Sequence, residues 1–282
     1  MKKTLSLLAA LLMAVVFSFP VFAAESADSI QVLVTISDGE GKLVMAQEPV
    51  TVTDRDNDGK FTIDEALYAA HEAKYTGGAA EGYVTENTAY GLSLAKLWGV
   101  ANGGSYGYYV NNGSAMGLTQ EVNEGDRINA YAYTDLTTWS DKYCYFDKHS
   151  VSGKAGDTVT LTLLASDCDE NFSPVTVAVE DAVIYMDGKA TEYKTDAEGK
   201  VTLTLSESGK YVISAASDIM TLVPPVCIAD VEVVADTTAA VESDDTQGEA
   251  VTSTGCGGYV SITGIAVIGL AAAFVFRRRN EE

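Results

Sequence analysis

The chain has 282 residues, of which 40 are acidic and 18 are basic, so its formal net charge at pH 7 is −22. A field of this sign repels nucleic-acid backbones and anionic lipid surfaces and attracts cations, which argues against a nucleic-acid partner. The chain contains only four cysteines, too few for a disulfide scaffold in a chain of this length.

The first 23 residues have the pattern of a cleaved signal peptide. Lys2 and Lys3 precede an apolar run, which ends in a small-x-small cleavage site at Ala23. An uncleaved membrane anchor is the alternative, but the run is short for a bilayer span. We therefore expect residues 1–23 to be removed and the following residues to be exported.

Residues 28–148 are expected to form an α+β domain. Short apolar patterns predict strands over 31–36 and 48–53. A helix is expected over 62–74, because apolar residues recur there three and four positions apart, and the Gly77-Gly78 pair ends it.

The second half of this domain is predicted to contain another helix and a hairpin. A short helix is expected within 88–100. Alternating residues over 106–110 lead into an Asn112-Gly113 turn, a strong hairpin pattern. A further strand is expected around 127–133, after a Gly125-Asp126 turn.

The stretch DRDNDGKFTIDE, residues 54–65, follows the ligand register of an EF-hand calcium loop. Such loops place ligands at positions 1, 3, 5, 7, 9 and 12, with glycine at position 6. Gly59 is at the sixth position, and Phe61 is at the eighth, where an apolar side chain can turn inward. The predicted ligands are side-chain oxygens and the backbone carbonyl of the lysine: Asp54, Asp56, Asp58, Lys60, Thr62 and Glu65.

Calcium is the cation that this loop is expected to hold. Closely packed carboxylates repel one another unless a hard cation lies between them, and oxygen ligands favour calcium over zinc. An acidic surface turn is the alternative. A strand pattern precedes the loop, whereas a calcium sensor needs two helices whose angle changes, so we expect a structural ion.

No catalytic motif is complete. His71-Glu72 begins a zinc-protease pattern, but the histidine required at position 75 is Tyr75. His71 is therefore expected to be a half-exposed residue on the helix, one turn after Leu67. We predict that the chain is not an enzyme, with an exported hydrolase as a less favoured alternative.

Aromatic residues crowd the second half of the first domain. Core and cross-strand packing is one explanation for them. The other is a recognition face for a peptide, a glycan or a corrinoid-like small molecule. The candidate ligand-binding residues are Tyr106, Tyr108, Tyr109, Tyr131, Tyr133 and Trp139.

Residues 104–133 combine an aromatic-Val-Asn-Asn-Gly hairpin, a Gly-Asp turn and an aromatic strand. This stretch resembles the bacterial domain related to the C-terminal β-domain of transcobalamin and intrinsic factor, and the match extends loosely upstream to Ile30. The resemblance implies an exported surface protein. It also raises an alternative function, a receptor that captures cobalamin-like or other small nutrients.

Residues 150–234 are predicted to form an Ig-like β-sandwich, because short β-rich runs alternate with Gly, Asp and Pro turns. The stretches GDTVTLTL and TDAEGKVTLTLSESGKYVISA are similar to Ig-like and prealbumin-like modules of bacterial surface proteins. That similarity implies a fold and a location but no ligand. A disulfide between Cys168 and Cys227 is expected, since both fall in this domain.

The C-terminal residues are predicted to form a stalk and an anchor. Residues 235–258 are acidic and rich in Thr and Ser, which predicts a disordered stalk. The apolar run 259–276 would extend roughly 27 Å as a helix, just enough for a bilayer core. Three arginines begin the segment 277–282, which is therefore expected to be the cytoplasmic tail.

The stretch TGCGGYVSITGIAVIGLAAAFVFRRR is similar to C-terminal sorting tails of surface proteins. The similarity implies processing near Cys256, Gly257 and Gly258. No LPxTG-type motif is present, so a plain membrane anchor is the conservative alternative.

Taken together, these patterns predict a mainly β protein with an α+β N-terminal domain. We expect a calcium-binding, membrane-anchored extracellular surface protein that acts as a ligand-binding or adhesion module. Its expected partners are calcium, an extracellular ligand and the membrane.

Overall fold

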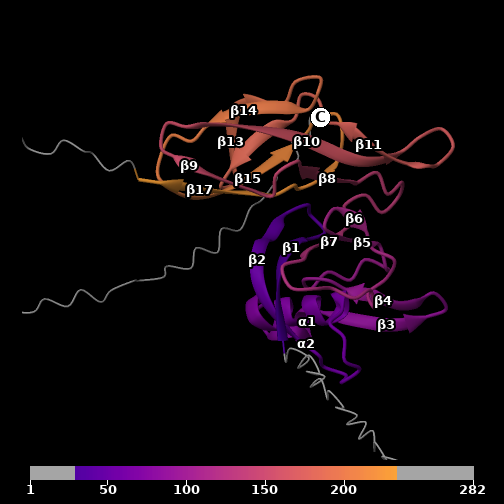
Figure 1. Cartoon of the computed structure of the whole chain (residues 1–282). Helices are drawn as coiled ribbons and strands as arrows, with labels where there is room; N and C mark the ends of the chain where they lie inside the picture. Colours follow the sequence, from indigo (N-terminus) through magenta and orange to yellow (C-terminus); the bar gives the residue numbers. More distant parts are fainter. Residues whose placement is uncertain (1–28, 234–282) are drawn as a thin grey trace, which may run out of the picture.

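The computed structural model describes residues 29–233 (Figure 1). Of these residues 51% are in strands and 8% in helices, so the fold is mainly β. The predicted signal peptide, stalk, transmembrane anchor, cytoplasmic tail and sorting motif lie outside the described residues. Within the described part of the chain, no helix has the length and hydropathy needed to cross a membrane.

The chain folds into two stacked units (Figure 1). The first unit consists of β1 (Ser29–Ser37), β2 (Leu43–Thr53), α1 (Ile63–Lys74), α2 (Gly78–Gly82), β3 (Val84–Thr88), β4 (Gly91–Lys96), β5 (Tyr106–Val110), β6 (Gly113–Ser114) and β7 (Arg127–Ala132). The second unit consists of β8 (Lys142–Phe146), β9 (Ser150–Lys154), β10 (Thr158–Cys168), β11 (Pro174–Ala178), β12 (Val183–Met186), β13 (Lys189–Lys194), β14 (Lys200–Thr204), β15 (Gly209–Ala216), β16 (Leu222–Val223) and β17 (Cys227–Glu232).

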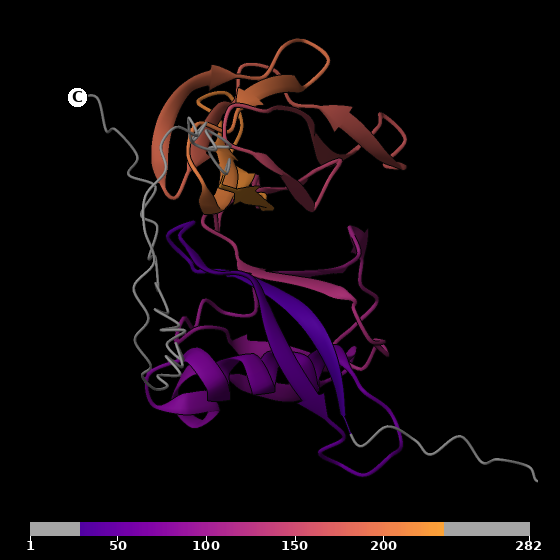
Figure 2. The same ribbon diagram turned by 60° about the vertical axis from the view of Figure 1, so that its left-hand side comes forward.

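The first unit is built on a mixed five-stranded sheet. Its strand order is β2-β1-β7-β5-β6, and β1 pairs in parallel with β7 while the other neighbours are antiparallel. Side chains alternate along β1, so that Val34 and Ile36 are fully buried on one face. In Figure 2 the long indigo strands β1 and β2 cross in front of α1.

The helix α1 covers this face of the sheet. Ile63 and Leu67 are fully buried, and α1 packs against β2 of the sheet and against α2. Burial of one stripe of an amphipathic helix against a sheet is the main source of its stability. The strands expected over 31–36 and 48–53 and the helix expected over 62–74 are therefore confirmed.

The helix expected within 88–100 is wrong. The structure has a hairpin there, in which β3 pairs with β4, and the first residue of β4, Gly91, has φ +101°. Leu94 is buried and Leu92 is half-buried against the same core, which is the alternation of a strand. The mixed apolar spacing of this stretch therefore reflects period two rather than a helical face.

The hairpin of β5 and β6 forms, but its turn lies one residue earlier than expected. Asn111 and Asn112 have φ values of +50° and +68°, as the two central residues of a type I′ turn require. Gly113 already belongs to β6. Asparagine tolerates positive φ better than most residues, which explains why the Asn-Asn pair makes the turn.

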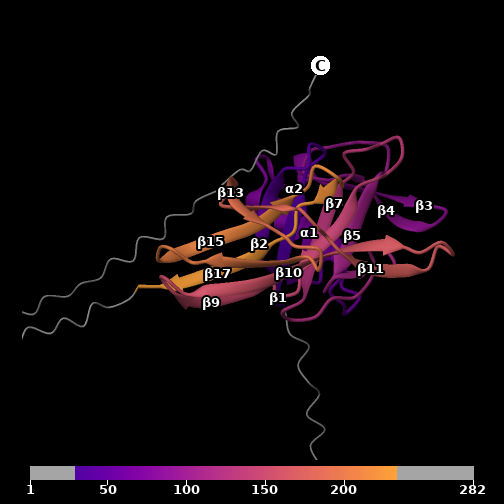
Figure 3. The same ribbon diagram turned by 90° about the horizontal axis from the view of Figure 1, so that it is seen from above.

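The second unit is a sandwich of two sheets. One sheet has the order β11-β10-β8-β16, with β14 also paired to β10, and the other has the order β13-β12-β15-β17-β9. Both sheets turn apolar residues inward, including Leu161, Ile184 and Ile213, all fully buried. Seen from above, the sandwich lies across the first unit (Figure 3).

The strand β8 belongs to the second unit, although its residues fall within the range 28–148 expected for the first domain. It pairs with β10 and with β16. The strand pairing therefore changes from one unit to the other within 133–141 rather than at 148.

The sheet of the first unit has a second face, which meets the sandwich. Tyr109 stacks on Tyr143 of β8, with ring centroids 3.7 Å apart and planes at 9°. Tyr131 and Tyr143 are both buried in this contact. Stacked aromatic rings bury a large apolar area, so the two units share an interface with its own small core.

A glycine is required beneath one of these rings. Gly107 of β5 is opposite Tyr131 of β7, and a Cβ atom at Gly107 would lie 2.2 Å from Cζ of Tyr131. No larger residue fits without moving the ring. The pairing of glycine with an aromatic residue across two strands therefore positions Tyr131 toward the interface.

The expected disulfide between Cys168 and Cys227 is wrong. Both cysteines are free, and so is Cys144. Cys168 is exposed at the end of β10, whereas Cys227 is buried at the start of β17. Membership of one sandwich is thus not enough to bring two cysteines within bonding distance.

His71 joins α1 to the end of the β3–β4 hairpin. Its side chain is fully buried, its Nδ1–H donates to the carbonyl of Leu67 at 2.6 Å, and its Nε2 accepts the N–H of Trp98 at 2.9 Å. Burial lowers the pKa of His71 to about 4. The neutral imidazole is therefore a structural connection. Its expected place on the helix is confirmed, but the expected half-exposure is wrong, because the ring packs against Tyr83 and Trp98.

This buried histidine predicts a specific loss of stability in acid. The unfolded chain binds a proton at His71 below about pH 6.5, whereas the folded chain resists protonation down to about pH 4. Stability is thus present above pH 6.5 and falls as the pH drops toward 4, by up to roughly 3 kcal/mol.

Chemical denaturation between pH 7 and pH 4 measures this effect. We expect the free energy of unfolding to fall more steeply with pH for the native chain than for His71→Gln, whose side chain does not titrate. Carboxylates titrate in both proteins and cancel in the comparison. If the free energies of unfolding of the native chain and of His71→Gln change equally with pH, protonation of His71 is not coupled to folding.

Candidate metal site

The loop between β2 and α1 is organised by its own aspartates. Asp54 accepts the N–H of Gly59 at 2.8 Å and that of Asp58 at 3.2 Å, and Asp58 accepts the N–H of Lys60 at 2.9 Å. Gly59 has φ +84°, which favours glycine at the sixth position of the loop. The backbone therefore wraps around the carboxylates.

Three of the predicted ligands come together. Carboxylate oxygens of Asp54, Asp56 and Asp58 all lie within 4.8 Å of one another. Two oxygens bound to one calcium ion at about 2.4 Å can be at most about 5 Å apart. The three side chains are therefore spaced closely enough to share one ion, and Asp56 and Asp58 are exposed to solvent.

Glu65 closes the loop from the first turn of α1. Its side chain is only 5% exposed, and its carboxylate accepts the N–H of Arg55 at 2.5 Å and the N–H of Thr62 at 3.0 Å. Thr62 caps the helix in return by accepting the N–H of Glu65 at 3.4 Å. The two ends of the loop are thus held together, but Glu65 is not in the cluster of three carboxylates.

The second half of the loop is fixed by a segment distant in sequence. The carbonyl of Phe61 accepts the N–H of Val122 at 2.8 Å, and Ile63 donates to the carbonyl of Gln120 at 3.1 Å. Phe61 turns inward onto the core, as expected for the eighth position. The support from 118–122 was missed in the sequence, because that stretch has no strand or helix periodicity.

Both basic residues of the loop make contacts outside it. The guanidinium of Arg55 lies 3.2 Å from the ring centroid of Tyr68. The ammonium of Lys60 pairs with Glu121. Neither contact places a basic side chain between Asp54, Asp56 and Asp58. The negative charge of these three carboxylates is therefore not neutralised by a basic residue of the loop.

The six candidate aromatic residues do not form one exposed face. Tyr106 and Tyr108 are half-buried against the core of the first unit, and the hydroxyl of Tyr106 donates to backbone carbonyls. Tyr109, Tyr131 and Tyr133 belong to the interface between the units.

Trp139 is the exposed member of the six, with 58% of its surface accessible. Its Nε1–H donates to the hydroxyl of Ser105 at 3.2 Å. The placement of the other five matches the packing explanation. The proposed sorting residues Cys256, Gly257 and Gly258 lie outside the described part of the chain.

Comparisons with known proteins identify no family. No protein-family model and no curated protein matches the chain. The similarity to the transcobalamin-related domain therefore rests only on the sequence pattern of residues 104–133.

Similar solved structures include Ig-domain proteins, at low levels of similarity. A Dscam structure is 12% identical over 40% of this chain and 26% of its own, with a TM-score of 0.21. The N-terminal four Ig domains of Dscam1 isoform 9.44 are 9% identical over 74% of this chain and 44% of theirs, with a TM-score of 0.20. Murine CEACAM1b is 10% identical over 72% of this chain and 100% of its own, with a TM-score of 0.18.

These scores carry no inference about shared fold or activity. The chain spans less than half the length of the two Dscam structures. The function is therefore inferred from the residues of this chain.

The closing role of Glu65 can be measured without any metal. In EDTA, Glu65→Gln should lower the free energy of unfolding by about 1–3 kcal/mol, because the amide nitrogen cannot accept one of the two backbone N–H groups. Urea denaturation gives this value. Asp56→Asn, at an exposed position, is the matched control and should change stability by less than about 0.5 kcal/mol. If Glu65→Gln and Asp56→Asn change the free energy of unfolding equally, Glu65 does not hold the two ends of the loop together.

Proposed function

We propose that the loop 54–65 binds one calcium ion, and that this ion stabilises an extracellular, membrane-anchored surface protein. The observation that carries the proposal is the cluster of Asp54, Asp56 and Asp58, whose oxygens lie within 4.8 Å of one another. The chain carries an excess of negative charge, which raises the local concentration of cations.

The remaining ligands follow from the loop register. We assign the backbone carbonyl of Lys60 to the seventh position, and Thr62 to the ninth, directly or through water. Glu65 is assigned to the twelfth position, where it already bridges the two ends of the loop. Hard oxygen donors of this kind suit calcium.

The ion is proposed to be structural rather than regulatory. A strand, β2, enters the loop, and only α1 leaves it, so the loop lacks the pair of helices that a calcium sensor opens. The capping box of α1 and the contacts with 118–122 position both ends of the loop independently of an ion. Millimolar extracellular calcium would keep even a weak site occupied.

The surface role rests on the two ends of the chain. The N-terminal apolar run and the C-terminal apolar run with its arginine cluster support export and anchoring. Between them, the two stacked units would display a ligand-binding or adhesion surface, with no catalytic step proposed. The described residues offer no observation that favours cobalamin over other ligands.

Calcium should raise the melting temperature without changing helix content. At free calcium about 100 times its dissociation constant, the stabilisation is about 2.7 kcal/mol, which corresponds to roughly 5–10 °C for a protein of this size. Thermal melts of the full-length chain, followed by far-UV circular dichroism with calcium and with EDTA, measure both quantities.

The double variant Asp54→Asn/Asp58→Asn removes two ligands and should abolish the calcium-dependent shift. Glu198→Gln removes one acidic residue at an exposed turn of the second unit and should keep the shift. If the double variant responds like the native chain, calcium binds elsewhere. A large calcium-dependent change in helix content would contradict the structural role.

A further inference from the structure

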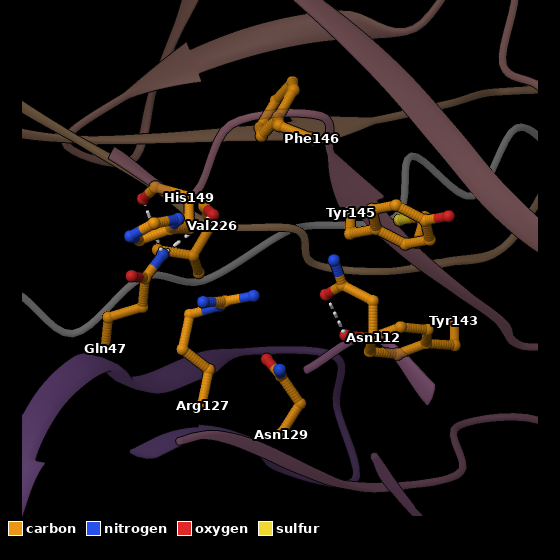
Figure 4. Close-up of a pocket in the computed structure, with 10 residues that line it drawn as sticks. Gln47, Asn112, Arg127, Asn129, Tyr143, Tyr145, Phe146, His149 and Val226 are labelled. Atoms are coloured by element: carbon orange, nitrogen blue, oxygen red, sulfur yellow. Dashed lines mark hydrogen bonds between the residues drawn. The ribbon is translucent and has the colours of Figure 1, made fainter. Parts of the chain in front are cut away.

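A small pocket lies where the two units meet (Figure 4). Its volume is about 20 Å³. The first unit contributes residues of β2, β7 and the β5–β6 turn, and the second unit contributes β8 and the segments around His149 and Val226. The first unit lines it with four polar residues, Gln47, Asn112, Arg127 and Asn129.

Arg127 is a positive charge without an acidic partner in a strongly acidic chain. Residues 29–233 contain only one other arginine, Arg55, which lies on the ring of Tyr68. Within this range Arg127 forms no ion pair, although three lysines do. A partly buried guanidinium without a counter-charge is costly, and a bound anion would remove that cost.

The alternation of β7 positions Arg127 and Asn129 side by side on the face that meets the sandwich. The side chain of Asn129 points toward the guanidinium in Figure 4. Asn112 accepts the hydroxyl of Tyr143 at 3.1 Å through its oxygen, which leaves its amide nitrogen turned away from that tyrosine. The side-chain amides of Asn112 and Asn129, which come from two elements, therefore line the pocket beside Arg127.

Gln47 holds the rim of the pocket. Its side-chain nitrogen donates to the carbonyl of His149 at 3.0 Å and to the carbonyl of Val226 at 2.9 Å. These bonds tie β2 to two segments of the sandwich, so the walls of the pocket are fixed relative to each other. The charge of Arg127 also reaches across the pocket: after burial, it is the second cause that lowers the pKa of His149.

We propose that this pocket binds a carboxylate group of an extracellular ligand, with Arg127 as its charged partner and Asn112 and Asn129 as further donors. The planar fork of a guanidinium matches a carboxylate with two parallel hydrogen bonds. A volume of about 20 Å³ holds one or two waters, so the pocket takes a head group while the rest of the ligand lies outside.

The proposal rests on the ligand-binding role proposed above but is independent of the calcium loop. Ligand pockets commonly lie between two folded units, where each contributes part of the site. Measurements in EDTA therefore test the pocket separately from the calcium site. A negative result at one of these two sites leaves the other site unaffected.

The test is a titration of the isotopically labelled full-length chain with sodium acetate in EDTA. Acetamide, which has the same shape without the charge, is the matched ligand. Two-dimensional ¹H–¹⁵N spectra follow the side-chain amides of Asn112 and Asn129 and the Nε–H of Arg127. We expect saturable shifts with acetate and none of comparable size with acetamide.

Arg127→Gln should weaken acetate binding at least tenfold, and Arg127→Lys should restore only part of it because a lysine lacks the fork. Arg55→Gln is the control at the other arginine and should bind like the native chain. Far-UV circular dichroism of each variant verifies folding. Equal binding by native chain and Arg127→Gln, or equal shifts with acetate and acetamide, would overturn the proposal.

A parallel titration with inorganic phosphate distinguishes planar from tetrahedral anions. Weaker binding of phosphate than of acetate supports the carboxylate assignment. Tighter binding of phosphate that depends on Arg127 would overturn that assignment and identify the pocket as a phosphate site.

Discussion

The five-stranded sheet of the first unit has two faces, and both must be covered. One face carries the apolar residues of β1 and is packed by α1 and the β3–β4 hairpin. The other carries Tyr109 and Tyr131, whose rings gain stability when they are buried, and β8 of the sandwich covers them. This second contact joins the two units and places the carboxylate pocket at their junction, while the metal loop leaves β2 at the far end of the same sheet.

The two proposed sites differ in how they depend on this arrangement. The metal loop is mostly local: its carboxylates, its glycine turn and its helix cap all lie within twelve consecutive positions, and the segment 118–122 adds backbone contacts to its second half. The pocket is non-local, because its lining residues come from both units and lie far apart in the chain. Changes that loosen the tyrosine stack should therefore act on the pocket and spare the loop.

The sequence predicted the local features well and the non-local ones poorly. The helix α1, the strand before the loop and the inward turn of Phe61 follow from short-range periodicity and ligand register. The strand β8 could not be assigned, because its partners β10 and β16 lie far along the chain. The same holds for the tyrosines of the first unit. Alternation along the strands indicates that they point to opposite faces of the sheet, but it does not show that the sandwich covers the second face.

The strand β17 has a mechanical consequence. It lies between β15, to which it is antiparallel, and β9, to which it is parallel, and it ends at Glu232, next to the last described residue. A tension applied to the chain beyond this point acts along β17. Because the bonds of both ladders run across the strand, they are loaded together in shear rather than opened one after another. A pulling force from the C-terminal end of the sandwich is therefore shared by both ladders at once.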